Sequence, residues 1–154
     1  MLWRTHILIT LFFCLCLIQY FEEKILLIFI ALFATLIPDI DSSDSKLGKN
    51  KIFLPLQLFT KHRGFFHSLV FLVILCLLII LFFPLLNKSI LFGLIIGYSS
   101  HLIADALTIQ GIAFFYPFSR KRIRGFIRTS GFFEWILFFV FLILNGFLIY
   151  KYIS

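Results

Sequence analysis

The sequence predicts an all-α membrane protein, a bundle of about five transmembrane helices in a single integral membrane domain over residues 1–154. Hydrophobic side chains make up 62% of the chain and the mean hydropathy is +1.08, whereas soluble domains contain roughly 45–50% apolar residues. Apolar runs such as residues 65–86 contain no Asp, Glu, Lys or Arg. A run of that length can cross a hydrocarbon core of ~30 Å, which takes about 20 residues.

Five apolar segments follow one another along the chain, at residues 7–21, 25–37, 65–86, 90–109 and 132–150. The second segment is short for a full crossing, because a helix rises only ~1.5 Å per residue. The first two segments therefore either form a shallow helical hairpin or thin the bilayer, so that Glu22, Glu23 and Lys24 reach the far surface. In both cases the chain returns to the side on which it began.

If each apolar segment crosses the membrane, successive loops lie on alternate faces. Lysine and arginine are distributed unevenly between these two faces. One face receives eleven of these cations, and the other receives only Lys24, Lys88 and Lys151. Because cytoplasmic loops carry the excess of positive charge, the first face is predicted to be cytoplasmic, with the N-terminus inside and the C-terminus outside a cell inner membrane. The net charge of +7 then indicates contact with membrane lipids and not with nucleic acid.

The two long loops, 38–64 and 110–131, both fall on the predicted cytoplasmic face. The second loop contains IAFFYPF at 112–118, directly before SRKRIRGFIR at 119–128. We expect this stretch to lie in the membrane interface, with its aromatic side chains toward the apolar core and its basic side chains toward the headgroups. Since functional residues concentrate in long loops, the functional site is expected on the same face.

Every histidine in the chain, together with three aspartates, also falls on this face. These residues come from four distant places: the start of the first segment, the PDID motif after the second, the HRGFFH motif around the start of the third, and the SSHLIAD motif near the end of the fourth. The cytoplasmic face was assigned from Lys and Arg alone. The presence of these His and Asp residues on the same face is therefore an independent observation. We interpret them as metal ligands: His6, Asp39, Asp41, His62, His67, His101 and Asp105.

The spacing within these motifs suits metal ligation. His101 and Asp105 stand four residues apart and therefore point from the same face of a helix. An Asp at mid-bilayer costs about 3 kcal/mol, and less near a helix end, so a metal would offset an unfavourable position. Pro38 disfavours helix at the preceding residue, and we expect an extended stretch that presents Asp39 and Asp41 on one side.

The number of candidate ligands exceeds the three protein ligands of a typical catalytic zinc ion. Two ions that share a bridging carboxylate would use them, so the expected cofactor is one or two divalent ions, zinc first and Mn²⁺ or Fe²⁺ as alternatives. Such a pair lowers the pKa of bound water and clamps both oxygens of a displacement, which favours hydrolysis. The alternatives are a hydrogen-bonded pair or proton relay for His101 with Asp105, and an interfacial position for His6.

At these motifs the sequence resembles the YdjM-type membrane-bound metal-dependent hydrolases of bacteria and archaea. The matching stretches are TH at 5–6, PDIDS at 38–42, HRGFFHS at 62–68 and GYSSHLIADALTIQGIAFFYPF at 97–118. The resemblance implies a small polytopic protein with the seven His and Asp residues near a metal site, and it implies a hydrolase. The chain departs from the pattern at Phe66, where a small or polar residue is expected, which puts a local polar contact in doubt.

Together these observations predict hydrolysis of a phosphoester or related ester of a lipid-like substrate at the cytoplasmic membrane surface. Arg63 could hold a phosphoryl oxygen through its planar donor fork, or it could be a headgroup or orientation charge. Glu134 could be a general base or the partner of a ligating histidine, or it could pair with Arg128. The sequence leaves the oligomeric state open.

Two other classes of function stay open at this stage. Intramembrane His and Asp residues also line the translocation paths of metal or proton transporters. Such a path needs ionisable groups in both halves of the membrane, but the middle of the third and fifth segments contains none, and Asn145 is the only mild exception. The histidines could also be incidental in a non-enzymatic, structural or regulatory membrane protein.

Overall fold

The computed structural model describes residues 1–41 and 64–154. Within these ranges the chain forms five α-helices and no strand, as predicted for an all-α protein. The α-helices are α1 (Trp3–Leu17), α2 (Lys24–Ala34), α4 (Leu69–Phe82), α5 (Lys88–Ala106) and α6 (Phe132–Ile153). The 3₁₀ turns between them are η1 (Ile18–Tyr20), η2 (Pro38–Asp41) and η4 (Phe65–His67).

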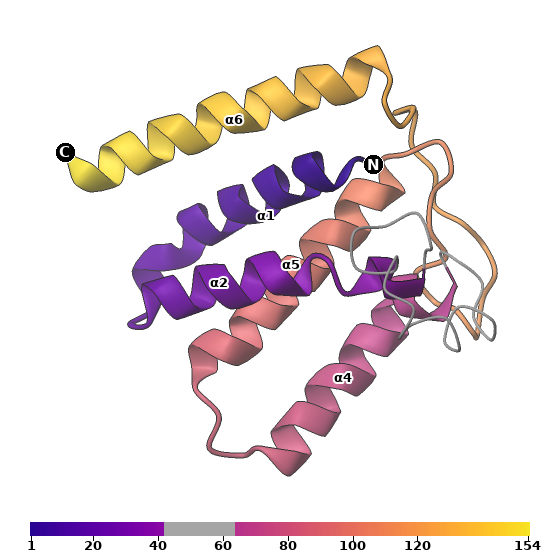
Figure 1. Ribbon diagram of the computed structural model, residues 1–154. Helices are drawn as coiled ribbons and strands as arrows, with labels where there is room; N and C mark the ends of the chain where they lie inside the picture. Colours follow the sequence, from indigo (N-terminus) through magenta and orange to yellow (C-terminus); the bar gives the residue numbers. More distant parts are fainter. Residues whose placement is uncertain (42–63) are drawn as a thin grey trace.

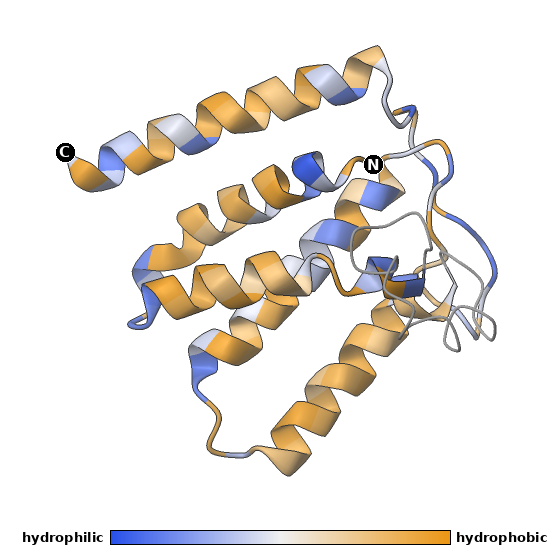
Figure 2. Cartoon of the chain, in the orientation of Figure 1, coloured by the Kyte–Doolittle hydropathy of each residue, from blue (hydrophilic) through white to orange (hydrophobic). Residues whose placement is uncertain are grey.

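Successive helices run in alternating directions, so that segments distant in the sequence meet at one end of the bundle (Figure 1). We define the site end as the end where the N-terminus, η2, η4 and the last turn of α5 lie. The far end contains η1, the connection between α4 and α5, and the C-terminus. The helices are predominantly apolar along their length, and α4 is almost uniformly so (Figure 2). This grouping of segments is the one expected from alternate crossings.

Three helical stretches in the described ranges are long and apolar enough to cross a membrane: residues 3–20, which are α1 with η1, and the helices α5 and α6. Helices α2 and α4 have 11 and 14 residues and are shorter than their apolar segments. Pro38 follows α2 and Pro84 follows α4, and the residue before a proline disfavours helix. Ser68 also begins α4 late, by accepting a hydrogen bond from the Phe71 N–H. The structure therefore has five helices, while five full crossings stay a prediction.

Helices α2 and α5 pack closely because α5 presents two glycines to α2. A Cβ added to Gly97 would lie 2.1 Å from the backbone oxygen of Ala31, and one added to Gly93 would lie 2.9 Å from that of Leu27. The stretch GLIIG is a G-x-x-x-G pair, which in membrane helices lets two backbones approach each other. The contact brings His101, one turn beyond Gly97, against the end of α2.

Three buried hydroxyl groups join α1, α2 and α5 near the site end. Thr10 Oγ1 in α1 hydrogen-bonds to Thr35 Oγ1, at the C-terminal cap of α2, over 2.9 Å and lies 2.6 Å from Ser100 Oγ in α5. Ser100 Oγ also donates to the Gly97 carbonyl over 2.8 Å. Hydrogen bonds between membrane helices contribute about 0.6 kcal/mol each on average. This hydroxyl layer fixes how the three helices are rotated relative to one another.

Helix α6 is attached to the rest of the bundle chiefly through α1. Asn145 Nδ2 donates to the Leu8 carbonyl over 2.9 Å, and the Tyr152 hydroxyl donates to the Leu15 carbonyl over 2.8 Å. Most other side chains of α6 are apolar and exposed, which is the pattern of a helix that contacts lipid. Asn145 is buried, as expected for a polar side chain that must find a partner inside a membrane.

Gly97→Ala is expected to destabilise the protein by roughly 1–3 kcal/mol, because the new methyl group would overlap the Ala31 carbonyl. Gly146→Ala on α6 is the matched control, since nothing lies within 4 Å of a Cβ there and alanine favours helix over glycine. Thermal unfolding of both variants in detergent micelles is the measurement. A Gly97→Ala protein as stable as the Gly146→Ala protein would contradict the close contact.

Candidate metal centre

Helix α5 supplies two of the predicted ligands, His101 and Asp105, which are 0% and 2% exposed. They stand four residues apart and project from the same face of α5. His101 Nδ1 lies 2.7 Å from the carbonyl oxygen of Thr35. Because a carbonyl can only accept, Nδ1 carries the proton, and in the neutral ring Nε2 keeps its lone pair. Nε2 is the atom of His101 that faces the other predicted ligands.

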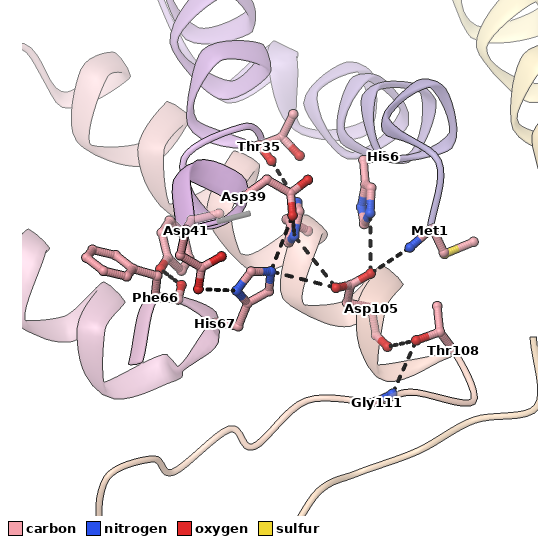
Figure 3. A network of polar contacts seen from close by, with 12 residues as sticks. Met1, His6, Thr35, Asp39, Asp41, Phe66, His67, Asp105, Thr108 and Gly111 are labelled. Carbon is pink, nitrogen blue, oxygen red and sulfur yellow. Dashed lines mark hydrogen bonds and ion pairs between the residues drawn. The ribbon is translucent and has the colours of Figure 1, made fainter. Parts of the chain in front are cut away.

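His6, in the first turns of α1, lies directly beside this pair. Its ring stacks on that of His101 with a centroid distance of 4.1 Å and an interplanar angle of 8°. His6 Nε2 lies 3.4 Å from Asp105 Oδ1, an oxygen that also contacts the Met1 amino group at 2.9 Å (Figure 3). His6, His101 and Asp105 form a first buried group whose donor atoms could hold a metal ion.

His67 and two aspartates form the other side of the cluster. His67 Nε2 lies 3.4 Å from Asp39 Oδ1 and His67 Nδ1 lies 3.6 Å from Asp41 Oδ2, so the carboxylates flank opposite edges of one imidazole (Figure 3). The extended stretch predicted here is wrong, because residues 38–41 form the 3₁₀ turn η2. Residues two apart in a 3₁₀ turn point about 120° away from each other. That geometry suits two edges of a ring better than one shared side.

His101 and Asp105 connect the two sides of the cluster. Asp39, His67 and His101 form a second group whose donor atoms could hold a metal ion, so His101 belongs to both groups. Asp105 Oδ1 faces His6, whereas Oδ2 lies 3.8 Å from His67 Nε2 and 3.9 Å from His101 Nε2. One carboxylate thus presents its two oxygens to two sets of donors, which is the arrangement that a bridging carboxylate requires.

The cluster contains buried polar atoms that the protein leaves unsatisfied. His101 Nε2 and His6 Nδ1 are buried without a hydrogen-bond partner, and each such atom costs about 1–3 kcal/mol. Burial alone would raise the pKa of Asp39, but the hydrogen bond with His67 holds that pKa well below its usual range. Asp39 is therefore ionised. A divalent cation would neutralise carboxylate charge and coordinate an unpaired nitrogen, so these residues fit a metal ion.

The structure brings together six of the seven predicted ligands: His6, Asp39, Asp41, His67, His101 and Asp105. Asp39 is the most exposed of them, with 22% of its side chain accessible. The other five are at most 4% exposed. The seventh predicted ligand, His62, and the predicted substrate-binding Arg63 lie outside the described residues.

Glu134 lies at the site end but belongs to neither group of donors. Both of its carboxylate oxygens accept backbone hydrogen bonds, Oε1 from the Leu2 N–H and Oε2 from the Ser130 N–H at 2.6 Å. The sequence also suggested a pair with Arg128, but in the described part of the chain Glu134 makes no ion pair with that residue. Glu134 therefore fastens the start of α6 to the start of α1. Its role as a general base stays a prediction.

Three features that support the cluster were not predicted from the sequence. Thr35 acts through its backbone carbonyl, which no side-chain pattern can reveal. The Tyr98 hydroxyl donates to the carbonyl of Phe66 and so fixes the turn η4, which means that a polar contact exists at position 66 but comes from the backbone. The close contact of α5 with α2 did have a visible signal in GLIIG at 93–97.

The fold and the cluster define a class: a helical membrane protein with a buried set of histidines and aspartates that could hold a divalent metal ion. Comparison with known proteins gives the family. The family model described as "YdjM inner membrane protein" matches residues 1–153. This chain belongs to the YdjM family, which confirms the resemblance seen in the motifs.

Two kinds of relative show how far the likeness extends. The chain is 33% identical over 135 residues to the uncharacterized protein YvsG of Bacillus subtilis (strain 168), covering 85% of this chain and 83% of YvsG. It is 35% identical over 92 residues to the inner membrane protein YdjM of Escherichia coli (strain K12) and to that of Shigella flexneri. Those alignments cover 56% of this chain and 47% of the relative, about half its length. No solved structure gives a significant match.

Asp105→Asn and His101→Gln are expected to lose bound divalent metal, because each removes a shared donor and nearly keeps the side-chain volume. The loss in affinity should exceed the ~10–100-fold typical of changes in the groups around a ligand. Glu22→Gln at the far end is the matched control and should keep the wild-type metal content. The measurement is the metal-to-protein ratio by mass spectrometry after loading with zinc, with thermal unfolding to verify folding. A folded Asp105→Asn protein with wild-type metal content would contradict the assignment.

Proposed function

We propose that this protein is a membrane-embedded, metal-dependent hydrolase that acts on a phosphoester or related ester of a lipid-like substrate. The observation that carries the proposal is Asp105, a buried carboxylate whose oxygens face two groups of His and Asp donors. A cluster that only stabilised the fold would gain from fewer ionisable groups, because burying each charge costs several kcal/mol. A surplus of ligands around one carboxylate instead supports a centre for one or two ions.

A bound divalent cation would polarise a phosphoryl or carbonyl oxygen and acidify water. Mixed imidazole and carboxylate ligands suit Zn²⁺, with Mn²⁺ or Fe²⁺ as alternatives. The protein's own residues orient this chemistry. The Thr35 carbonyl holds His101 in one tautomer, and Asp105 turns one carboxylate oxygen toward His6 and the other toward His67. Asp39 is the most exposed member of the cluster. We therefore assign the approach of the substrate to the side on which Asp39 lies.

The position of the cluster supports a lipid-like substrate. Apolar side chains are exposed near the site end at Leu69 in α4, at Ile103 in α5 and at Leu107 directly after α5. An amphiphilic substrate can lay its chain along such a surface while its polar head enters at Asp39. Arg63, outside the described residues, is proposed to hold a phosphoryl oxygen through its guanidinium group.

For Glu134 the contacts favour a positioning role over direct proton transfer. Its two oxygens accept hydrogen bonds from the backbone of Leu2 and Ser130, so a substrate or water would have to displace one of them. By holding Leu2, Glu134 sets where α1 begins and therefore where His6 stacks on His101. A general-base role is the alternative.

We further propose that the protein is a multi-pass protein of the inner membrane, with its N-terminus in the cytoplasm. Three helical stretches suit a crossing, and the relatives in Escherichia coli and Shigella flexneri are named inner membrane proteins. The excess of Lys and Arg in the segments that meet at the site end supports a cytoplasmic position for that end. Membrane lipids are then its immediate partners.

Cysteine labelling in cells tests this orientation. Lys121→Cys is expected to react with a membrane-impermeant maleimide only after the cells are opened, whereas Glu22→Cys should react in intact cells, because both positions are exposed but lie at opposite ends. The unsubstituted protein is the control, since its cysteines, Cys14, Cys16 and Cys76, lie in apolar helices. The reverse pattern would contradict the orientation without affecting the metal centre.

Zinc-loaded protein is expected to hydrolyse at least one member of a panel of phospholipids and isoprenoid phosphates in detergent micelles, measured as released phosphate or headgroup. Chelation should abolish turnover and added zinc should restore it. Because Lewis-acid stabilisation is worth several kcal/mol, Asp105→Asn should lower kcat at least ~100-fold, whereas Glu22→Gln should not. Zinc flux across vesicles without turnover would favour a transporter, and turnover that survives chelation would contradict metal dependence.

A further inference from the structure

The segment between α5 and α6 forms a fixed hairpin over residues 109–128, which we call the basic hairpin. Its two arms are joined at Ile112 and Ile123, whose backbones exchange hydrogen bonds of 3.1 and 2.9 Å. The hairpin is also tied to α4, because the Leu69 N–H donates to the Phe114 carbonyl over 2.9 Å. These bonds hold the basic hairpin at the site end, next to the last turn of α5 (Figure 1).

The basic hairpin exposes aromatic and cationic side chains together. Phe118 is 84% exposed and Phe126 is 70% exposed. In a water-soluble protein, phenylalanine side chains are more often buried than exposed. Five cations alternate with or follow these aromatics, and all are exposed: Arg120, Lys121, Arg122, Arg124 and Arg128. Within the part of the chain that the structure describes, no carboxylate forms an ion pair with any of them. Their charge is therefore available to an external anion.

A hollow lies at the base of the basic hairpin, where its two arms meet the segment that leads to α6. Its volume is about 400 Å³, and it is lined by Ile109, Gln110, Ile127, Arg128 and Thr129. Small-molecule sites are typically ~300–1,000 Å³ with apolar walls and a few polar groups that fix orientation. Here a guanidinium, an amide and a hydroxyl provide donors, and two isoleucines provide the apolar walls. This combination suits a phosphate group that is attached to an apolar body.

We propose that the basic hairpin binds an anionic phospholipid of the surrounding leaflet, with the phosphate at Arg128 in this hollow. Arginine presents planar paired donors that match phosphate oxygens, and the exposed ring of Phe126 beside the hollow would lie among the acyl chains. Basic residues near an anionic membrane surface each strengthen the attraction to it. The site is separate from the metal centre and does not depend on the proposed hydrolysis.

The exposed aromatics and the apolar helices of the chain together decide between a lipid and the other polyanions that cations attract. A free phosphate ion would be held by the charges alone and would not need the rings of Phe118 and Phe126 to face outward. Single-stranded nucleic acid can stack its bases on such rings, so the choice against it rests on the membrane character of the chain. Cations combined with exposed apolar side chains are the pattern of a segment that lies in a membrane interface. The basic hairpin also belongs to a chain with helices long and apolar enough to span a membrane, so lipid headgroups lie within its reach.

The test uses the protein as purified and measures lipid retention, so its outcome does not require turnover at the metal centre. Full-length protein in detergent is mixed with equal amounts of phosphatidylglycerol and phosphatidylcholine, and the retained lipids are counted by native mass spectrometry. Wild type should retain phosphatidylglycerol preferentially. Arg128→Gln should lower its retention about five-fold, as expected for ~1 kcal/mol per cation. Lys151→Gln, a cation exposed at the far end, is the matched control and should leave retention unchanged.

Phe126→Ser provides a second, uncharged variant, and it should lower retention of phosphatidylglycerol while the net charge stays the same. Several outcomes would overturn the proposal. These are equal retention by wild type and Arg128→Gln, an equal loss with Lys151→Gln, or displacement of the lipid by millimolar inorganic phosphate. Displacement by a DNA duplex from wild type and Phe126→Ser alike would assign the basic hairpin to nucleic acid instead.

Discussion

The close contact between α2 and α5 is the constraint on which the rest of the structure depends. Gly97 has no side chain to keep the Ala31 carbonyl away, so the end of α2 comes to rest against the last turns of α5. The last carbonyl groups of a helix have no partner within it, and that of Thr35 accepts the His101 Nδ1 proton. The end of α2 at Thr35 and the contact of α2 with α5 thus decide that Nε2, and not Nδ1, of His101 faces the cluster.

The polarity of the bundle is graded along its length, and this gradient explains how a membrane protein tolerates so many buried ionisable groups. The His and Asp residues lie at the site end, and the hydroxyl layer of Thr10, Thr35 and Ser100 lies between α1, α2 and α5 beneath them. Further along α5 the contact is made by glycines and apolar side chains. The buried His and Asp residues therefore lie at one end of the bundle, and an ionised group costs less near the end of a membrane helix than at its middle.

Much of the fold followed from hydropathy, and most of the site followed from the spacing of His and Asp. The five helices and their alternation could be predicted because each apolar run is bounded by polar turns. The exact helix ends could not, because α2 already ends at Ala34, before the residue that Pro38 restricts, and Ser68 delays α4 by capping its backbone. The positions of the clustered His and Asp residues were predictable because ionisable side chains are rare in such a chain, whereas metal binding by them stays a prediction. Asp39 and Asp41 were misjudged because a 3₁₀ turn replaces the extended stretch, and Thr35 contributes a backbone atom that a sequence does not display.

The same contact that orients His101 also bears on the choice between hydrolysis and transport. A translocation path along the seam of α2 and α5 would have to pass Gly97 and Gly93, but there the α2 backbone fills the space that a single Cβ would need. Opening the seam would break the bond between Thr35 and His101 and would separate the donors that share His101. An ion that moved along this seam could be released only by such an opening, whereas a hydrolase needs its ligands to stay in place while a substrate enters from one side. The packing of α2 on α5 therefore favours a fixed centre at the membrane surface.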